Sequence, residues 1–90
     1  MDGCNTRVEY KGASFIVQTQ DKGPSARYVE SLIYKSGRLL NSRRTFYTAF
    51  INSPNFEKIL HQILDDQHAG IVEDIKQGKY ERFLDDAEKA

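Results

Sequence analysis

The sequence has few of the features that mark secreted or membrane-spanning proteins. It contains one cysteine and two prolines among its 90 residues, and no run of more than three apolar residues. A lone Cys4 cannot form an intramolecular disulfide, which favours a reducing compartment, so we expect a cytoplasmic protein. A transmembrane helix needs about 20 apolar residues, and the N-terminus shows no secretory signal pattern. The sequence therefore predicts no membrane partner.

Motifs that carry chemistry are also missing. The sequence has no Gly-rich phosphate loop, no pair of cysteines and no nucleophile placed beside a base in a recognisable motif. We therefore expect neither an enzyme nor a bound cofactor. With 39% hydrophobic and 29% charged residues, the composition is nevertheless that of a folded globular protein.

Charge is balanced overall but divided along the chain. The net charge is zero, made of +4 over residues 1–53 and −4 over residues 54–90. This division predicts attraction between a basic sheet and an acidic helix, either within one chain or between two copies.

Residues 28–47 are typical of a β-hairpin, around which we expect the fold to be organised. Lys35 and Ser36 suit the centre of a type I turn, and Gly37 suits the left-handed position that follows. The resulting register places Tyr34 opposite Arg38, Ile33 opposite Leu39, Leu32 opposite Leu40, Val29 opposite Arg43 and Tyr28 opposite Arg44.

The residues before the hairpin predict further strands. We expect residues 1–6 to be a flexible tail, because they show no periodicity. Residues 7–10 and 14–20 alternate as strands do, with a tight turn at Lys11 and Gly12. Together with the hairpin they form a predicted antiparallel meander of three to four strands over residues 7–47.

The residues after the hairpin predict helices. Ser53 and Pro54 form a helix-start signal, so a helix should begin near Pro54. A stripe of residues at helical spacing should pack on the sheet: Phe56, Ile59, Leu60, Ile63 and Leu64. Gln67 and Asp74 interrupt this stripe, so we expect a break between His68 and Gly70. A second helix would end at Gly78, and a third would contain Tyr80, Phe83, Leu84 and Ala87.

The fold class expected is therefore α+β, in one domain covering residues 1–90 with its helical part at residues 54–88. The predicted hairpin has apolar residues on both faces, which is unusual for a sheet with one face in water. One face carries Tyr28, Leu32, Tyr34, Leu40 and Phe46, and the other carries Val29, Ile33, Leu39 and Tyr47. We expect the chain's own helix to cover one face and a partner to cover the other.

This two-sided hairpin predicts a protein-interaction or regulatory module, whose first partner is a second copy of the chain. The expected interaction surface contains seven residues: Tyr28, Tyr34, Arg38, Arg43, Arg44, Phe46 and Tyr47.

Two alternatives remain open. The basic and aromatic residues between Lys35 and Arg44 could bind nucleic acid, although zero net charge removes the usual long-range attraction. His61, Asp65 and His68 share one side of a continuous helix and could bind a metal ion. The competing interpretation of the second group is a polar flank of an amphipathic helix.

Overall fold

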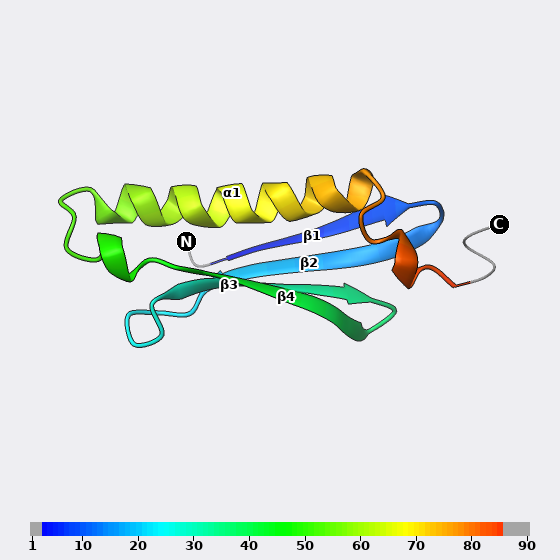
Figure 1. Ribbon diagram of the computed structural model, residues 1–90, viewed down its shortest axis with the longest axis horizontal. Coiled ribbons are helices and arrows are strands. Elements are labelled where there is room, and N and C mark those ends of the chain that lie inside the picture. The colour runs from blue at the N-terminus through cyan, green and yellow to red at the C-terminus, as the bar shows by residue number, and fades with distance from the viewer. Residues whose placement is uncertain (1–2, 86–90) are drawn as a thin grey trace.

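Four antiparallel strands follow one another across a single sheet in the order of the sequence (Figure 1). They are β1 (Gly3–Tyr10), β2 (Ala13–Asp21), β3 (Tyr28–Lys35) and β4 (Arg38–Phe46). The computed structural model describes residues 3–85, and within them one α-helix, α1 (Phe56–Lys76), follows the sheet. The predicted α+β class and antiparallel meander are confirmed, whereas the prediction of two or three helices is wrong for this part of the chain.

The β1–β2 and β3–β4 hairpins close through two-residue turns. Lys11 and Gly12 have φ of 51° and 83°, and Ser36 and Gly37 have φ of 53° and 77°. Positive φ at both central residues defines the type I′ turn, whose twist matches that of the strands it joins. The left-handed conformation expected of Gly37 is confirmed, but the three-residue turn containing Lys35 is wrong.

The β3–β4 register consequently differs from the prediction. The observed partners include Lys35 with Arg38, Tyr34 with Leu39, Glu30 with Arg44 and Tyr28 with Phe46. The pairing shifts at Ile33 and Tyr34, where Leu40 is the extra residue of a β-bulge. The two-residue turn exchanges the predicted faces of two leucines: Leu39 lies opposite Tyr34, whereas Leu40 packs against the core.

The N-terminal segment is longer and more ordered than the sequence indicates. The residues at positions 3–6, expected to be a tail, form the first half of β1 and pair with the end of β2. Met1 and Asp2 of that tail lie outside the described residues. Pairing satisfies backbone groups whatever the side-chain pattern, which explains why an aperiodic segment forms a strand.

The helix α1 runs without interruption through Gly70, so the predicted break is wrong. It begins at Phe56, two residues after Pro54, and no side chain caps its N-terminus. Its C-terminus is the predicted one. Gly78 adopts a φ of 85°, and the amides of Gly78 and Lys79 bond to the carbonyls of Ile75 and Asp74, which is a Schellman motif.

The predicted third helix is a single 3₁₀ turn, Glu81–Phe83, in the described part of the chain, and Ala87 lies outside that part. Tyr80 and Leu84 flank this turn and are buried at the end of the core, where the Tyr80 ring meets Phe15 edge-on at 6.5 Å. The segment therefore closes one end of the sheet–helix layer.

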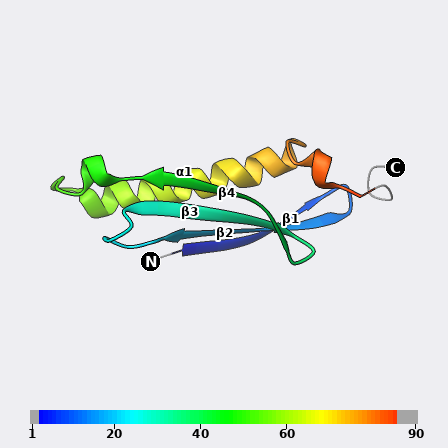
Figure 2. The ribbon, with the colours of Figure 1, turned by 60° about the horizontal axis from the view of Figure 1, so that its bottom comes forward.

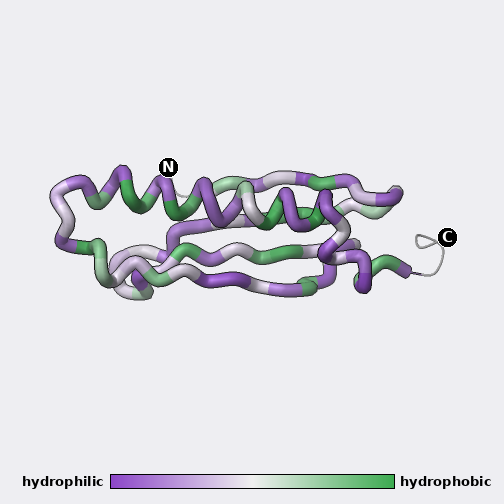
Figure 3. Tube along the Cα trace, turned by 45° about the horizontal axis from the view of Figure 1, so that its top comes forward, coloured by the Kyte–Doolittle hydropathy of each residue, from purple (hydrophilic) through white to green (hydrophobic). Residues whose placement is uncertain are grey.

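The helix α1 lies along one side of the sheet and packs mainly on β1 and β2 (Figures 1 and 2). Hydrophobic residues recur along α1 and along the strands beneath it (Figure 3). They form two clusters, one centred on Phe15, Val17, Ile33, Ile71 and Ile75, the other on Val29, Tyr47 and Leu64. Leu60 and Ile63 of the predicted stripe pack against the second cluster and are half-buried.

A row of polar side chains, which we call the polar seam, separates these clusters. Each strand contributes one hydroxyl and α1 contributes an amide and an imidazole: Thr6, Thr19, Ser31, Thr45, Gln67 and His68. Within residues 3–85, no buried side-chain nitrogen or oxygen lacks a hydrogen-bond partner. Gln67 and His68 therefore fit within the buried side of a continuous helix, which removes the reason for the predicted break.

The side chains of the seam form a continuous hydrogen-bonded chain. The Gln67 amide nitrogen can only donate, and it donates to Ser31 Oγ at 2.8 Å and to the Arg43 carbonyl at 3.2 Å. The Ser31 and Thr19 hydroxyls share a hydrogen bond at 2.7 Å. The His68 ring extends the chain to β1, because its Nδ1 lies 2.7 Å from Thr19 Oγ1 and its Nε2 lies 2.7 Å from Thr6 Oγ1. Burial lowers the pKa of His68, opposed by the nearby Asp65 charge.

Among the described residues, no helix is both long and apolar enough to cross a membrane.

Candidate interaction surface

The side of the sheet opposite α1 has no cover from the described residues and carries a group of side chains that we call the open face. Val29, Ser31 and Ile33 are fully buried beneath α1. Because side chains alternate along a strand, their neighbours on β3 point the other way. The open face comprises Ile16, Tyr28, Glu30, Leu32, Tyr34, Leu39, Ser42, Arg44 and Phe46.

An aromatic pair lies at one end of the open face. The rings of Tyr28 and Phe46, which are cross-strand partners, have centroids 5.0 Å apart. The Arg44 guanidinium lies 4.7 Å from the Tyr28 centroid, within the range of a cation–π contact. Phe46 remains 60% exposed. The Phe46 ring is therefore held against Tyr28 while most of its surface faces water.

An ion pair crosses the middle of the open face. Arg44 Nε lies 3.1 Å from Glu30 Oε2, and Lys22 Nζ lies 3.9 Å from the other carboxylate oxygen. The Glu30 side chain is 14% exposed and that of Arg44 is 53% exposed. Two basic groups therefore share one carboxylate near the centre of the surface.

A second apolar group lies beyond the ion pair, at the Ser36–Gly37 end of the hairpin. Tyr34 is paired with Leu39 on one side and with Ile16 on the other. Leu39 is 52% exposed, and Leu32 lies one step back along β3 on the same face. The observed register places Glu30 and Leu39 on the open face, although neither was predicted to belong to the interaction surface. The predicted register placed Leu39 on the opposite face.

The seven residues predicted for the interaction surface do not all meet there. Tyr28, Tyr34, Arg44 and Phe46 lie on the open face, and Arg38 is exposed at the turn opposite Lys35. Arg43 points to the other side of the sheet, toward α1.

Tyr47 is the clear misplacement, because it is only 1% exposed and belongs to the second hydrophobic cluster. Its hydroxyl donates to Asp21 Oδ1 at 2.6 Å. Burial, together with the Asp21 carboxylate, raises the pKa of Tyr47 to about 12. Tyr47 follows β4, where the chain turns toward α1, so strand alternation does not determine its direction.

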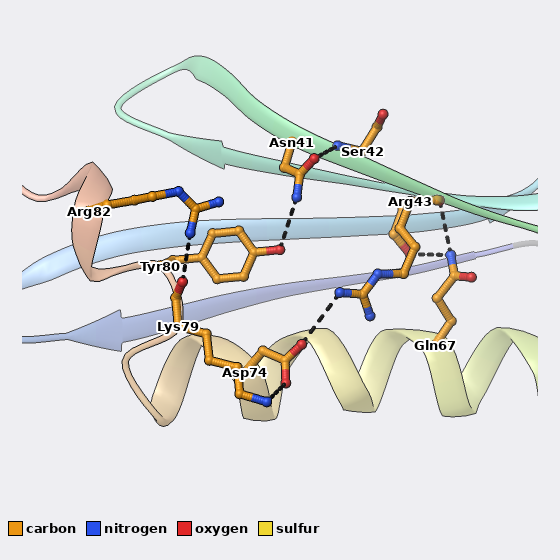
Figure 4. Close-up of polar contacts among 9 residues, drawn as sticks. Asn41, Ser42, Arg43, Gln67, Asp74, Lys79, Tyr80 and Arg82 are labelled. Carbon is orange, nitrogen blue, oxygen red and sulfur yellow. Dashed lines mark hydrogen bonds and ion pairs between the residues drawn. The ribbon is translucent and has the colours of Figure 1, made fainter.

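A shallow depression of about 360 Å³ lies between β4 and α1 and is lined by Arg43, Thr45, Ile63, Asp66 and Gln67. Figure 4 shows its polar contacts: Arg43 Nη2 lies 3.4 Å from Asp74 Oδ2, and Gln67 donates to the Arg43 carbonyl. Asp74 also pairs with Lys79 at 3.3 Å. These groups bind one another, so we interpret the depression as the junction that joins the acidic helix to the basic strand.

The proposed metal ligands are not brought together. His68 is buried with both ring nitrogens within hydrogen-bonding distance of threonine hydroxyls, whereas His61 and Asp65 are exposed on α1. Across residues 3–85, no three His, Cys, Asp or Glu side chains form a group that could hold a metal ion.

Comparisons of the chain with protein-family models, with curated proteins and with solved structures found no match.

Proposed function

We propose that this protein is a non-enzymatic interaction module that forms a homodimer through its open face. The observation that carries the proposal is the open face itself, where Leu39 and Phe46 remain 52% and 60% exposed. Grouped exposed apolar side chains on a small protein favour association.

Charge and size favour a second copy as the occupant. The centre of the open face carries both signs of charge, with Glu30 beside Arg44 and Lys22, so a second copy can place a carboxylate against a basic group of the first. An interface of ordinary size buries about 800 Å² on each partner, which is about a seventh of the 5657 Å² accessible surface of the chain. A symmetric pair is also the commonest assembly of soluble proteins.

The rival function is binding of single-stranded nucleic acid, favoured by the exposed Phe46 and Tyr28 rings with Arg44 beside them. Bases stack on such rings in proteins that bind single strands. Two other arginines of the predicted basic hairpin lie away from these rings. Arg43 pairs with Asp74 on the other side of the sheet, and Arg38 lies at the turn.

The proposal is tested by sedimentation equilibrium from about 1 to 100 μM, a range set by ordinary interface affinities. Wild-type protein should approach the mass of a dimer, and Phe46→Ser should shift the equilibrium toward monomer. Phe50→Ser is the matched control, because Phe50 is 42% exposed but lies in the 3₁₀ turn Thr48–Phe50, off the open face.

A wild-type monomer throughout this range would contradict the proposal. If that monomer also bound a fluorescent mixed-sequence oligonucleotide, and Phe46→Ser abolished this binding, the rival function would replace it.

A further inference from the structure

The order of the residue pairs on the open face of the β3–β4 hairpin indicates how two copies could pack together. Its cross-strand pairs, from the open end to the turn, are Tyr28 with Phe46, Glu30 with Arg44, Leu32 with Ser42 and Tyr34 with Leu39. In each pair the first residue belongs to β3 and the second to β4. The acid is on β3 and the base is directly opposite on β4.

This order is self-complementary about one particular axis. A two-fold axis that runs parallel to the strands, between β3 and β4, places β3 of one copy on β4 of the other and preserves each level along the strands. Glu30 then meets Arg44 of the second copy, and Arg44 meets the second Glu30. At the two ends, Tyr28 meets Phe46 and Tyr34 meets Leu39.

Two other arrangements bring like charges together. A two-fold axis perpendicular to the strands at the level of the ion pair places Glu30 on Glu30 and Arg44 on Arg44. Edge-to-edge pairing of two β4 strands gathers Arg38, Arg43 and Arg44 from both copies, and the bulge at Leu40 further distorts that edge. Charged side chains and bulges are the features that protect strand edges from pairing.

We infer that two copies stack open face to open face about the axis parallel to the hairpin, with Glu30 of each copy paired with Arg44 of the other. This inference rests on the proposed homodimer and specifies its geometry. Sheets that stack in this way lie about 10 Å apart with strands inclined by about 30°. The existing Glu30–Arg44 pair, with Lys22 beside it, becomes part of a charge cluster at the centre of the interface.

The test uses two charge reversals, Glu30→Arg and Arg44→Glu. Each variant alone places like charges against each other in the stacked dimer, and we expect its dissociation constant to rise about tenfold or more. When the two variants are mixed, the two arginines of one chain face the two glutamates of the other. Dimerisation should therefore return, as a heterodimer visible by native mass spectrometry.

The mixture separates contacts between chains from contacts within one chain. Each reversal removes the internal Glu30–Arg44 pair, and mixing does not restore it, so recovery reports only the intermolecular contact. The double variant Glu30→Arg/Arg44→Glu restores both kinds of pair and should dimerise like wild type. Circular dichroism of each variant establishes that it is folded.

The outcomes distinguish the two proposals. A monomeric wild type would remove the homodimer itself. If the wild type is a dimer, two results would overturn the inferred axis but not the homodimer. The reversed variants could stay monomeric on mixing, or each could dimerise on its own as tightly as the wild type.

Discussion

The two faces of the sheet have a similar layout but meet different surroundings. On the covered face, the polar seam divides two hydrophobic clusters, and on the open face the Glu30–Arg44 pair divides two apolar groups. The seam depends on Gln67 and His68 from α1 to satisfy its hydroxyls. The ion pair is made by neighbouring strands of the sheet alone.

This difference explains why one face requires the chain's own helix and the other can remain in water. Hydroxyls buried beneath α1 without partners would each cost about 1–3 kcal/mol, so covering this face requires the amide and imidazole that α1 supplies. The open face already pairs its charges, so exposure leaves only apolar area unsatisfied. That area is what a partner could bury.

The largest expected difference in stability is between substitutions of one phenylalanine on each face. Phe15→Ala, at a position with no exposed surface, should lower the free energy of unfolding by about 3–5 kcal/mol. Phe46→Ala, at a 60% exposed position, should cost less than about 1 kcal/mol in the monomer. Urea denaturation at a concentration that dissociates the dimer measures both, and equal losses would contradict the assignment of the two faces.

The polar seam should give an intermediate effect. Thr19→Val keeps the shape of the side chain but removes the hydroxyl that joins Ser31 to His68, and it should cost about 1–3 kcal/mol. Gln18→Val, at the adjacent exposed position of β2, is the control and should change stability by less than about 0.5 kcal/mol. A Thr19→Val variant as stable as the wild type would show that the seam's hydrogen bonds make no net contribution to the free energy of unfolding.

Acidification should produce the smallest effect. Burial holds the pKa of His68 below its ordinary value of 6.5, so near and below that pH the unfolded chain binds a proton that the folded chain does not. The free energy of unfolding should therefore be highest above about pH 7 and fall as the pH is lowered through 6.5 toward the folded pKa. His68→Gln should flatten this part of the profile, whereas His61→Gln, at an exposed position, should leave it unchanged.

Local features were predictable from the sequence because their causes are local. Lys11 with Gly12, the left-handed Gly37 and the helix end at Gly78 follow from backbone preferences of a few neighbouring residues. The register of the central hairpin was wrong because Ser36 also adopts positive φ, which an L-residue rarely does. The resulting two-residue turn places Leu39 opposite Tyr34 on the open face.

Features that depend on distant partners were not predictable. Gln67 was predicted to interrupt the apolar stripe because its partners Ser31 and Thr45 lie 36 and 22 residues away in the sequence. Tyr47 was assigned to the interaction surface because nothing near it indicates that the chain turns inward. Four of the seven predicted surface residues nevertheless lie on the open face, since alternation along β3 and β4 is a property of the strands themselves.

The polar seam also has a consequence for how the strands find their alignment during folding. Alternating apolar and polar residues penalise a slip of one residue, which turns every side chain to the wrong face. They do not penalise a slip of two, which keeps every side chain on its face. One hydroxyl per strand removes this ambiguity. A two-residue slip of β3 along β2 would place Ser31 opposite Val17 or Asp21 rather than Thr19, and the hydrogen bond between Ser31 and Thr19 would be lost.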